Sequence, residues 1–108
     1  MPFTYIARCV DDTLYVGYTE DLASREQLHN EGRGAKYTAE RTPVRIVYAE
    51  EYATVEGAIA RERQLKGWGR EKKEALIRDD RAALDYLSHR SSKATTAVTW
   101  RDLLKPEP

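Results

Sequence analysis

Five polar side chains along the chain are of the types that cleave phosphate esters: Tyr5, Tyr15, Arg25, His29 and Glu62. Arginine makes forked hydrogen bonds to phosphate oxygens, and a lone carboxylate can hold a Mg²⁺ ion that keeps most of its waters. Tyrosine or histidine can orient a water molecule and take its proton. The set therefore offers a group for each task of phosphodiester hydrolysis: charge neutralisation, water deprotonation and stabilisation of the departing oxygen.

These residues also have ordinary structural explanations. Tyr5 and Tyr15 could be amphipathic strand residues whose hydroxyls lie at the surface. Arg25 and His29 are four residues apart and could share a solvated helix face. Both interpretations stay open on the sequence alone.

The elements that must position the first four residues follow from periodicity and turn signals. Two runs rich in aromatic and β-branched residues, 3–10 and 13–19, flank two aspartates, which predicts an antiparallel hairpin. Thr19 or Asp21 can cap the helix that follows. This helix should end within 30–34, where two glycines occur.

The rest of the chain predicts one more strand and three helices. Residues 44–52 alternate and are rich in β-branched types, so they predict a strand. The segment 34–43 before it is polar and basic. Helices are predicted at 54–66, 71–77 and 80–89. The order of elements indicates a small α+β domain with a three-stranded antiparallel sheet flanked by helices.

Glu62 has an unusual place in the helix predicted over 54–66. Helical periodicity puts it on the apolar stripe, while Arg61 falls on the solvated face. A carboxylate among apolar residues needs a reason, because burying an unpaired charge is costly. Glu62 is therefore either a site residue or a buried carboxylate satisfied by an arginine or by backbone donors.

Length and composition bound the class of protein. The chain has 108 residues, 41% hydrophobic and 33% charged, which fits one globular core and excludes a disordered chain. No stretch approaches the roughly 20 consecutive apolar residues of a membrane helix, and the N-terminus lacks a signal-peptide layout. The single cysteine, Cys9, has no cysteine or histidine neighbours at zinc spacing. We expect a cytoplasmic protein with no membrane partner and a packing role for Cys9.

Charge is balanced overall but unevenly distributed. The 18 basic residues are matched by 18 acidic ones, whereas a nucleic-acid binder is usually basic. Segment 33–45 nevertheless has four basic residues against one acidic, and 61–78 has seven against three. Because salt screens charges separated by more than about 8–10 Å, each segment can attract a polyanion locally. We expect weak, strongly salt-dependent binding through one face.

Two tripeptides, Phe3-Thr4-Tyr5 and Tyr15-Val16-Gly17, precede Arg25, His29 and Glu62. In residue types and spacing this series resembles the GIY-YIG nuclease superfamily, with Thr4 and Val16 at the isoleucine positions of the two half-motifs. The resemblance implies a three-stranded antiparallel sheet flanked by helices and divalent-metal-dependent hydrolysis of phosphodiester bonds.

The stretches 34–38 and 41–44 resemble the small single-domain bacterial branch of that superfamily, which is related to the nuclease domains of excision-repair incision enzymes and junction nucleases. The resemblance covers residues 3–77. We therefore expect a nuclease domain over 1–78 and a helical extension over 79–108. Within the extension, 91–96 is linker-like, and a tail around Trp100 either docks or is mobile.

The resemblance implies a role for each of the five residues. Tyr5 and Tyr15 would orient or activate the attacking water, and His29 would assist proton transfer. Arg25 would stabilise the scissile phosphate. Glu62 would be the only protein ligand of Mg²⁺ or Mn²⁺.

The expected substrate is DNA, single-stranded or branched, in DNA repair or processing. The binding surface should come from the two basic segments, and its candidate residues are Arg33, Lys36, Tyr37, Arg41, Lys66 and Arg70. Trp68 either stacks on unpaired bases or anchors a helix end in the core. Two alternatives stay open: a non-catalytic nucleic-acid or adaptor module on the same scaffold, and a regulatory subunit that docks through its C-terminal tail.

Overall fold

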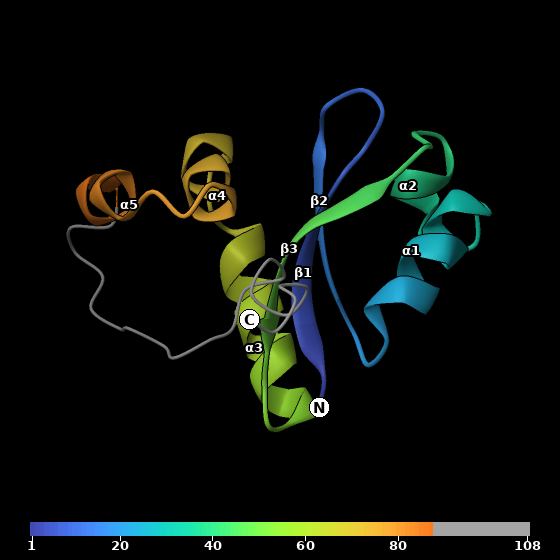
Figure 1. Ribbon diagram of the computed structural model, residues 1–108, viewed down its shortest axis with the longest axis horizontal. Coiled ribbons are helices and arrows are strands. Elements are labelled where there is room, and N and C mark those ends of the chain that lie inside the picture. Colours follow the sequence, from blue (N-terminus) through green and yellow to red (C-terminus); the bar gives the residue numbers. More distant parts are fainter. Residues whose placement is uncertain (88–108) are drawn as a thin grey trace, which may run out of the picture.

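A three-stranded antiparallel sheet forms the centre of the computed structural model, which describes residues 1–87 (Figure 1). Strand β1 (Phe3–Arg8) lies between β2 (Leu14–Thr19) and β3 (Arg45–Glu51) and is antiparallel to both. Residues 4–7 of β1 are buried without interruption, because both faces of a central strand are covered. The predicted hairpin and the predicted α+β class are confirmed.

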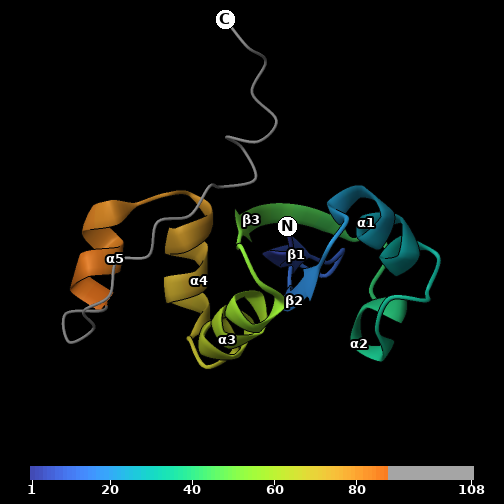
Figure 2. The ribbon, with the colours of Figure 1, turned by 90° about the horizontal axis from the view of Figure 1, so that it is seen from below.

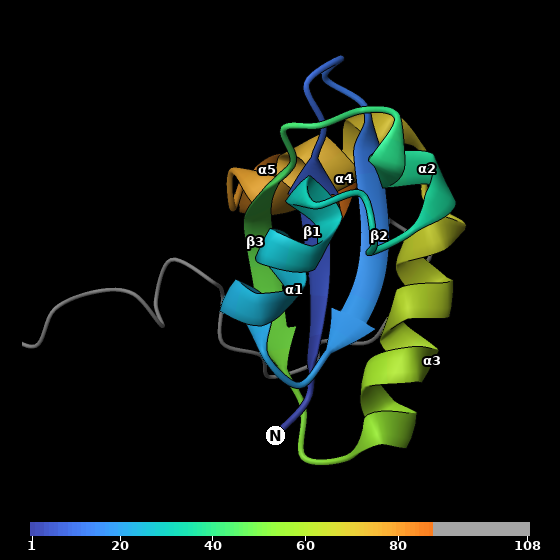
Figure 3. The ribbon, with the colours of Figure 1, turned by 90° about the vertical axis from the view of Figure 1, so that its right-hand side faces the viewer.

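Five helices are present among the described residues: α1 (Leu22–Asn30), α2 (Lys36–Ala39), α3 (Val55–Lys66), α4 (Arg70–Ile77) and α5 (Arg81–Leu87). Figure 2 shows α1 and α2 on one face of the sheet and α3 and α4 on the other, with α5 against α4. Figure 3 shows α3 running alongside β2. None of the helices in this part of the chain is long and apolar enough to cross a membrane.

Side-chain caps begin two of the helices where the sequence predicts them. Asp21 accepts a hydrogen bond from the Ser24 amide at 3.1 Å, and Thr54 accepts one from the Gly57 amide at 3.0 Å. Helix α2 is not predicted: it has four residues, and its N-cap makes no side-chain hydrogen bond. The end of the helix expected at 80–89, the linker 91–96 and the tail around Trp100 lie outside the described residues.

Two hydrophobic cores cover the two faces of the sheet, because successive side chains of a strand point to opposite faces. The core under α1 contains Tyr5, Ala7, Cys9, Leu22, Val44, Ile46 and Ala49. The core under α3 and α4 contains Ile6, Val16, Tyr48, Leu65, Leu76 and Ile77, with Trp68 and Leu84 packed against it. On this second face Thr4 donates a hydrogen bond to the Ala58 carbonyl at 2.7 Å, which ties β1 to α3.

A buried ion pair links α3 to β3. Glu50 is 2% exposed and accepts hydrogen bonds from Arg61 Nε at 2.8 Å and Arg61 Nη2 at 3.0 Å. It also accepts from the hydroxyls of Tyr48 and Tyr52. The prediction that Arg61 lies on the solvated face is wrong, because a buried carboxylate on the neighbouring strand draws its guanidinium inward.

Candidate active site

The face of the sheet under α1 carries a polar cluster inside an otherwise apolar core. The Tyr5 hydroxyl on β1 lies 2.7 Å from His29 Nε2 on α1 and accepts a hydrogen bond from Arg25 Nε at 3.4 Å. Tyr5 and His29 have no exposed surface. The interpretation of His29 as a residue of a solvated helix face is therefore wrong, and so is a surface position for the Tyr5 hydroxyl.

Helix α2 completes the surroundings of His29. Thr38, which is fully buried, lies with its Oγ1 2.7 Å from His29 Nδ1. The same hydroxyl donates a hydrogen bond to the Ala35 carbonyl at 3.1 Å. The sequence assigns Thr38 no role of its own; its only signal is its place in the stretch 34–38 that carries the family resemblance.

Tyr15 forms the partly exposed side of the cluster. Its ring centroid lies 5.3 Å from that of His29 and 6.4 Å from that of Tyr5. The Tyr37 ring of α2 stacks on Tyr15 at 6.2 Å, and the Arg41 guanidinium lies 3.9 Å above the Tyr37 ring. Tyr15 therefore lies between the buried imidazole of His29 and the exposed ring of Tyr37.

Glu62 reaches the cluster from α3. Its side chain is 15% exposed, and Lys66 Nζ lies 3.0 Å from its Oε2. Lys66 in turn lies 6.0 Å above the ring of Tyr15. The pKa of Tyr5 is raised mainly by burial and, to a smaller extent, by the negative charge of Glu62. Tyr5, Tyr15, Arg25 and His29 are thus brought together from β1, β2 and α1, and Glu62 on α3 is linked to them through Lys66 and through its charge.

Burial sets the protonation states of the cluster. It raises the pKa of Tyr5 to about 12, against the opposing effect of the Arg25 hydrogen bond and charge. Burial and the Arg25 charge lower the pKa of His29 below its ordinary 6.5. The hydrogen bond to Tyr5 raises the pKa of Arg25. At neutral pH Tyr5 is therefore protonated, His29 is neutral and Arg25 is charged.

Two glycines make room for the buried rings. A Cβ at Gly17, which faces Tyr5 across the β1–β2 ladder, would lie 2.6 Å from the Tyr5 hydroxyl oxygen and 2.8 Å from Cζ. A Cβ at Gly34 would overlap the imidazole of His29. The last residue of the second half-motif is therefore a glycine because the tyrosine of the first half-motif lies against it.

We expect Gly17→Ala to push the Tyr5 hydroxyl away from His29 Nε2 and to destabilise the fold by about 1–3 kcal/mol, since a packed ring must move. Thermal and urea denaturation measure the loss. Gly67→Ala is the matched control, because its Cβ would meet only ordinary contacts, the nearest at 3.5 Å. A Gly17→Ala protein as stable as the Gly67→Ala protein would contradict the close packing.

The residues predicted to contact nucleic acid differ in their exposure and in whether they already form ion pairs. Lys36 is exposed and has no ion-pair partner among residues 1–87, whereas Arg33 lies 3.3 Å from Glu31. Arg41 bonds to Asp11 Oδ2 at 3.1 Å as well as covering the Tyr37 ring. Tyr37, which stacks on Tyr15, and Lys66, 6.0 Å above the Tyr15 ring, are the exposed candidates that lie beside the cluster, and Lys66 also pairs with Glu62.

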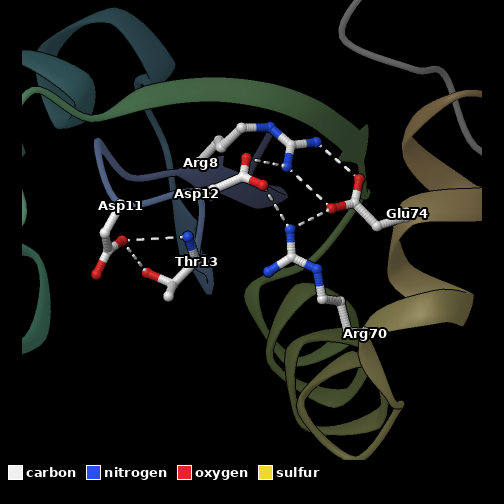
Figure 4. Close-up of polar contacts among 6 residues, drawn as sticks. All are labelled: Arg8, Asp11, Asp12, Thr13, Arg70 and Glu74. Atoms are coloured by element: carbon white, nitrogen blue, oxygen red, sulfur yellow. Dashed lines mark hydrogen bonds and ion pairs between the residues drawn. The ribbon is translucent and has the colours of Figure 1, made fainter.

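Arg70 belongs to a separate ion-pair network at the turn between β1 and β2. Its Nη2 lies 2.9 Å from Asp12 Oδ2 and 3.0 Å from Glu74 Oε2, and Arg8 bonds both of these carboxylates (Figure 4). A phosphate contact by Arg70 would compete with two carboxylates. Trp68 packs against the second core with Lys72 4.0 Å above its ring, which favours its role as a core anchor.

Glu62 is the one carboxylate among residues 1–87 whose charge acts on Tyr5. The described residues contain no group of three or more His, Cys, Asp and Glu side chains that could enclose a metal ion. A single, partly exposed carboxylate suits Mg²⁺ or Mn²⁺, because Mg²⁺ keeps several waters and binds through one or two carboxylates and substrate phosphates. Glu62 therefore fits the ion that the resemblance implies.

Comparison of the sequence and structure with known proteins identifies the family of the chain. Residues 1–75 match the model of the GIY-YIG catalytic domain. Two curated relatives come from Staphylococcus aureus: the UPF0213 protein of strain Mu3 and the UPF0213 protein SA0446 of strain N315. Each is 47% identical over 77 residues, which cover 71% of this chain and 94% of the relative. The solution NMR structure of the UPF0213 protein BH0048 from Bacillus halodurans is 34% identical, with a TM-score of 0.48, covering 86% of this chain and all of that one. The chain belongs to the GIY-YIG domain family.

Proposed function

We propose that this chain is a divalent-metal-dependent endonuclease that hydrolyses phosphodiester bonds in DNA. The observation that carries the proposal is the Tyr5 hydroxyl held between a charged Arg25 and a neutral, buried His29, with Tyr15 and Glu62 beside it. Family membership supports nuclease chemistry on a nucleic acid. The specific reaction follows from what each side chain can do.

Arg25 is the group placed to bind the scissile phosphate. It has no carboxylate partner among the described residues, and its one hydrogen bond, to Tyr5, is long at 3.4 Å. The guanidinium can therefore turn its remaining N–H groups toward phosphate oxygens, where arginine binds in a forked geometry. Lys66 adds positive charge beside the Tyr15 ring, and Lys36 is an exposed cation that precedes Tyr37 in α2.

Tyr5 and His29 act together as the proton acceptor. A tyrosine with a pKa of about 12 can take a proton from water only while it gives up its own, and His29 Nε2 lies 2.7 Å away to receive it. The Tyr5 hydroxyl has no exposed surface and contacts Arg25, so the proposal requires Arg25 to move onto the phosphate and let water reach Tyr5. Tyr15, which is partly exposed, orients that water.

In the proposed hydrolysis every bond and proton is accounted for. The water O–H bond breaks, its proton goes to Tyr5 while the Tyr5 proton goes to His29, and the new P–O bond forms as the 3′-oxygen departs and takes a proton from solvent. The products are a 5′-phosphate and a 3′-hydroxyl. When bound at Glu62, Mg²⁺ or Mn²⁺ would supply positive charge to the phosphate oxygens and the departing oxygen.

The test is incubation of the purified chain with single-stranded, duplex, flap and junction DNA, with Mg²⁺, Mn²⁺ or EDTA. We expect products with 5′-phosphate ends that appear with either ion and not with EDTA. A panel that yields no product, from a protein that binds DNA equally well in EDTA, would overturn the proposal in favour of a non-catalytic binding module.

The rate of cleavage should fall as the pH drops through the pKa of His29. Only neutral imidazole can accept the Tyr5 proton, and the pKa of His29 lies below 6.5. The rate should therefore be flat near pH 7 and decline on the acidic side. Single-turnover profiles check this: the acidic limb should disappear in His29→Gln and persist in His89→Gln. An acidic limb that is the same in the wild-type, His29→Gln and His89→Gln proteins would show that a group other than His29 causes it.

A further inference from the structure

Thr38 carries a fully buried hydroxyl next to the cluster. The proposed reaction gives this hydroxyl no role. Thr38 lies on α2, and its Oγ1 makes two contacts, one with His29 Nδ1 at 2.7 Å and one with the Ala35 carbonyl at 3.1 Å. A fully buried hydroxyl that contacts a buried imidazole determines where the protons of that imidazole lie, because each hydrogen bond has a donor and an acceptor.

The direction of each hydrogen bond follows from the Ala35 carbonyl, which has no proton to give. The single hydroxyl proton of Thr38 goes to that carbonyl, so Thr38 can only accept from His29 Nδ1. Nδ1 therefore carries the one proton of the neutral imidazole, and Nε2 is left with a lone pair. The Tyr5 hydroxyl donates to Nε2 and accepts from Arg25 Nε.

The opposite tautomer, with the proton on Nε2, is incompatible with the hydrogen bonds on both sides of the imidazole. A proton on Nε2 would point at the Tyr5 oxygen, and the Tyr5 proton would lose the one acceptor that the described contacts give it. A bare Nδ1 would take the Thr38 proton and break the Thr38–Ala35 hydrogen bond, while the Ala35 carbonyl would still accept from the Ala39 amide at 2.9 Å. The main cost of this tautomer is therefore the Tyr5 proton, which is left without an acceptor. Buried polar groups without partners are costly, so a single arrangement of protons satisfies all four contacts.

We propose that Thr38 is a positioning residue that holds His29 with its proton on Nδ1, so that Nε2 is free to accept the proton of Tyr5. Its effect on cleavage rests on the proposed function, whereas the tautomer of His29 does not. Gly34 contributes to the same arrangement, since only a residue without a Cβ leaves room for the imidazole there. The loop and short helix over 34–39 thus form a support for one ring.

Long-range ¹H–¹⁵N correlation spectra of the histidine rings test the tautomer directly. The chain has two histidines, so the His89→Gln variant assigns the signals of His29. At a pH above the His29 pKa we expect a protonated Nδ1 and an unprotonated Nε2 in the wild-type protein and in Thr38→Ser, which keeps the hydroxyl. In Thr38→Val, which replaces the hydroxyl by a methyl group, the proton should shift toward Nε2.

Cleavage gives the second measurement. Thr38→Val should lower the single-turnover rate constant by roughly tenfold to a hundredfold at saturating DNA, the usual range for removing a group that orients an active-site ligand, with no loss of DNA affinity. Thr38→Ser should restore most of the rate. A purely structural role would instead lower stability and leave the ring nitrogen shifts unchanged.

A wild-type His29 with its proton on Nε2 would overturn the proposal, as would a Thr38→Val protein that keeps both the Nδ1 proton and the full rate. If Thr38→Val does not fold, the wild-type spectrum still decides the tautomer, and Thr38→Ser still decides whether the hydroxyl is enough. If the wild-type chain cleaves no DNA, the proposed function fails, and the spectra alone decide the role of Thr38.

Discussion

Glu62→Gln is expected to reduce metal-dependent cleavage by roughly a thousandfold or more, because charge stabilisation by a metal ion is worth several kcal/mol in the transition state. Glutamine keeps the size of the side chain and removes the negative charge that would hold Mg²⁺ or Mn²⁺. Among residues 1–87, Glu62 is the one carboxylate whose charge acts on Tyr5, and no group of three acidic, histidine or cysteine side chains could hold the ion instead. The loss should therefore persist at high metal concentration.

The measurement is the single-turnover rate as a function of Mg²⁺ concentration, with circular dichroism as a check of the fold. Glu56→Gln is the matched control, since Glu56 is an exposed acidic residue in the first turn of the same helix. It should cleave like the wild-type protein. A Glu62→Gln protein that cleaves at the rate of Glu56→Gln would remove Glu62 from the proposed mechanism.

Arg61→Met is expected to destabilise the protein by about 3–5 kcal/mol, the usual cost of breaking a buried ion pair by removing one partner. The carboxylate of Glu50, which is 2% exposed in the wild-type protein, would keep only the Tyr48 and Tyr52 hydroxyls as donors. Because Glu62 follows Arg61 directly on α3, a looser α3 would also move the proposed metal ligand. The effect should therefore appear in both stability and cleavage.

Urea denaturation measures the change in the free energy of unfolding. Arg63→Met is the control: Arg63 is exposed on the same helix and has no ion-pair partner among residues 1–87, so the change should be within about 0.5 kcal/mol. Replacing Glu50 by Met as well should recover much of the loss, because it removes the unpaired charge. Equal stability of Arg61→Met and Arg63→Met would show that the pair contributes little.

Much of the fold could be predicted because its signals are local. Strand alternation, the Asp21 and Thr54 caps and the spacing of apolar residues on α3 each depend on a few neighbouring residues. Helix α2 could not be predicted, since four residues without a capping side chain leave no pattern. The inward turn of Arg61 could not be predicted either, because its cause, Glu50, lies on another element.

The candidate site shows the same division. The residue types and spacing select Tyr5, Tyr15, Arg25, His29 and Glu62, and the structure brings the first four together, with Glu62 linked to them through Lys66. Burial of Tyr5 and His29, and with it their protonation states, depends on packing between β1, α1 and α2. The place of Thr38 beside His29 depends on a contact between two helices, for which the sequence has no periodic signal.

The alternation of β1 makes its pairing register a condition for the proposed activity. Tyr5 faces the cluster, while its neighbours Thr4 and Ile6 face α3 and the second core. A slip of one residue would exchange the two faces, so that Thr4 or Ile6 would stand where the phenol is and Tyr5 would enter the opposite core. Such a chain would keep its secondary structure and lose its chemistry entirely. Misfolded molecules in a preparation would therefore lower the active fraction without altering the rate constant of the others.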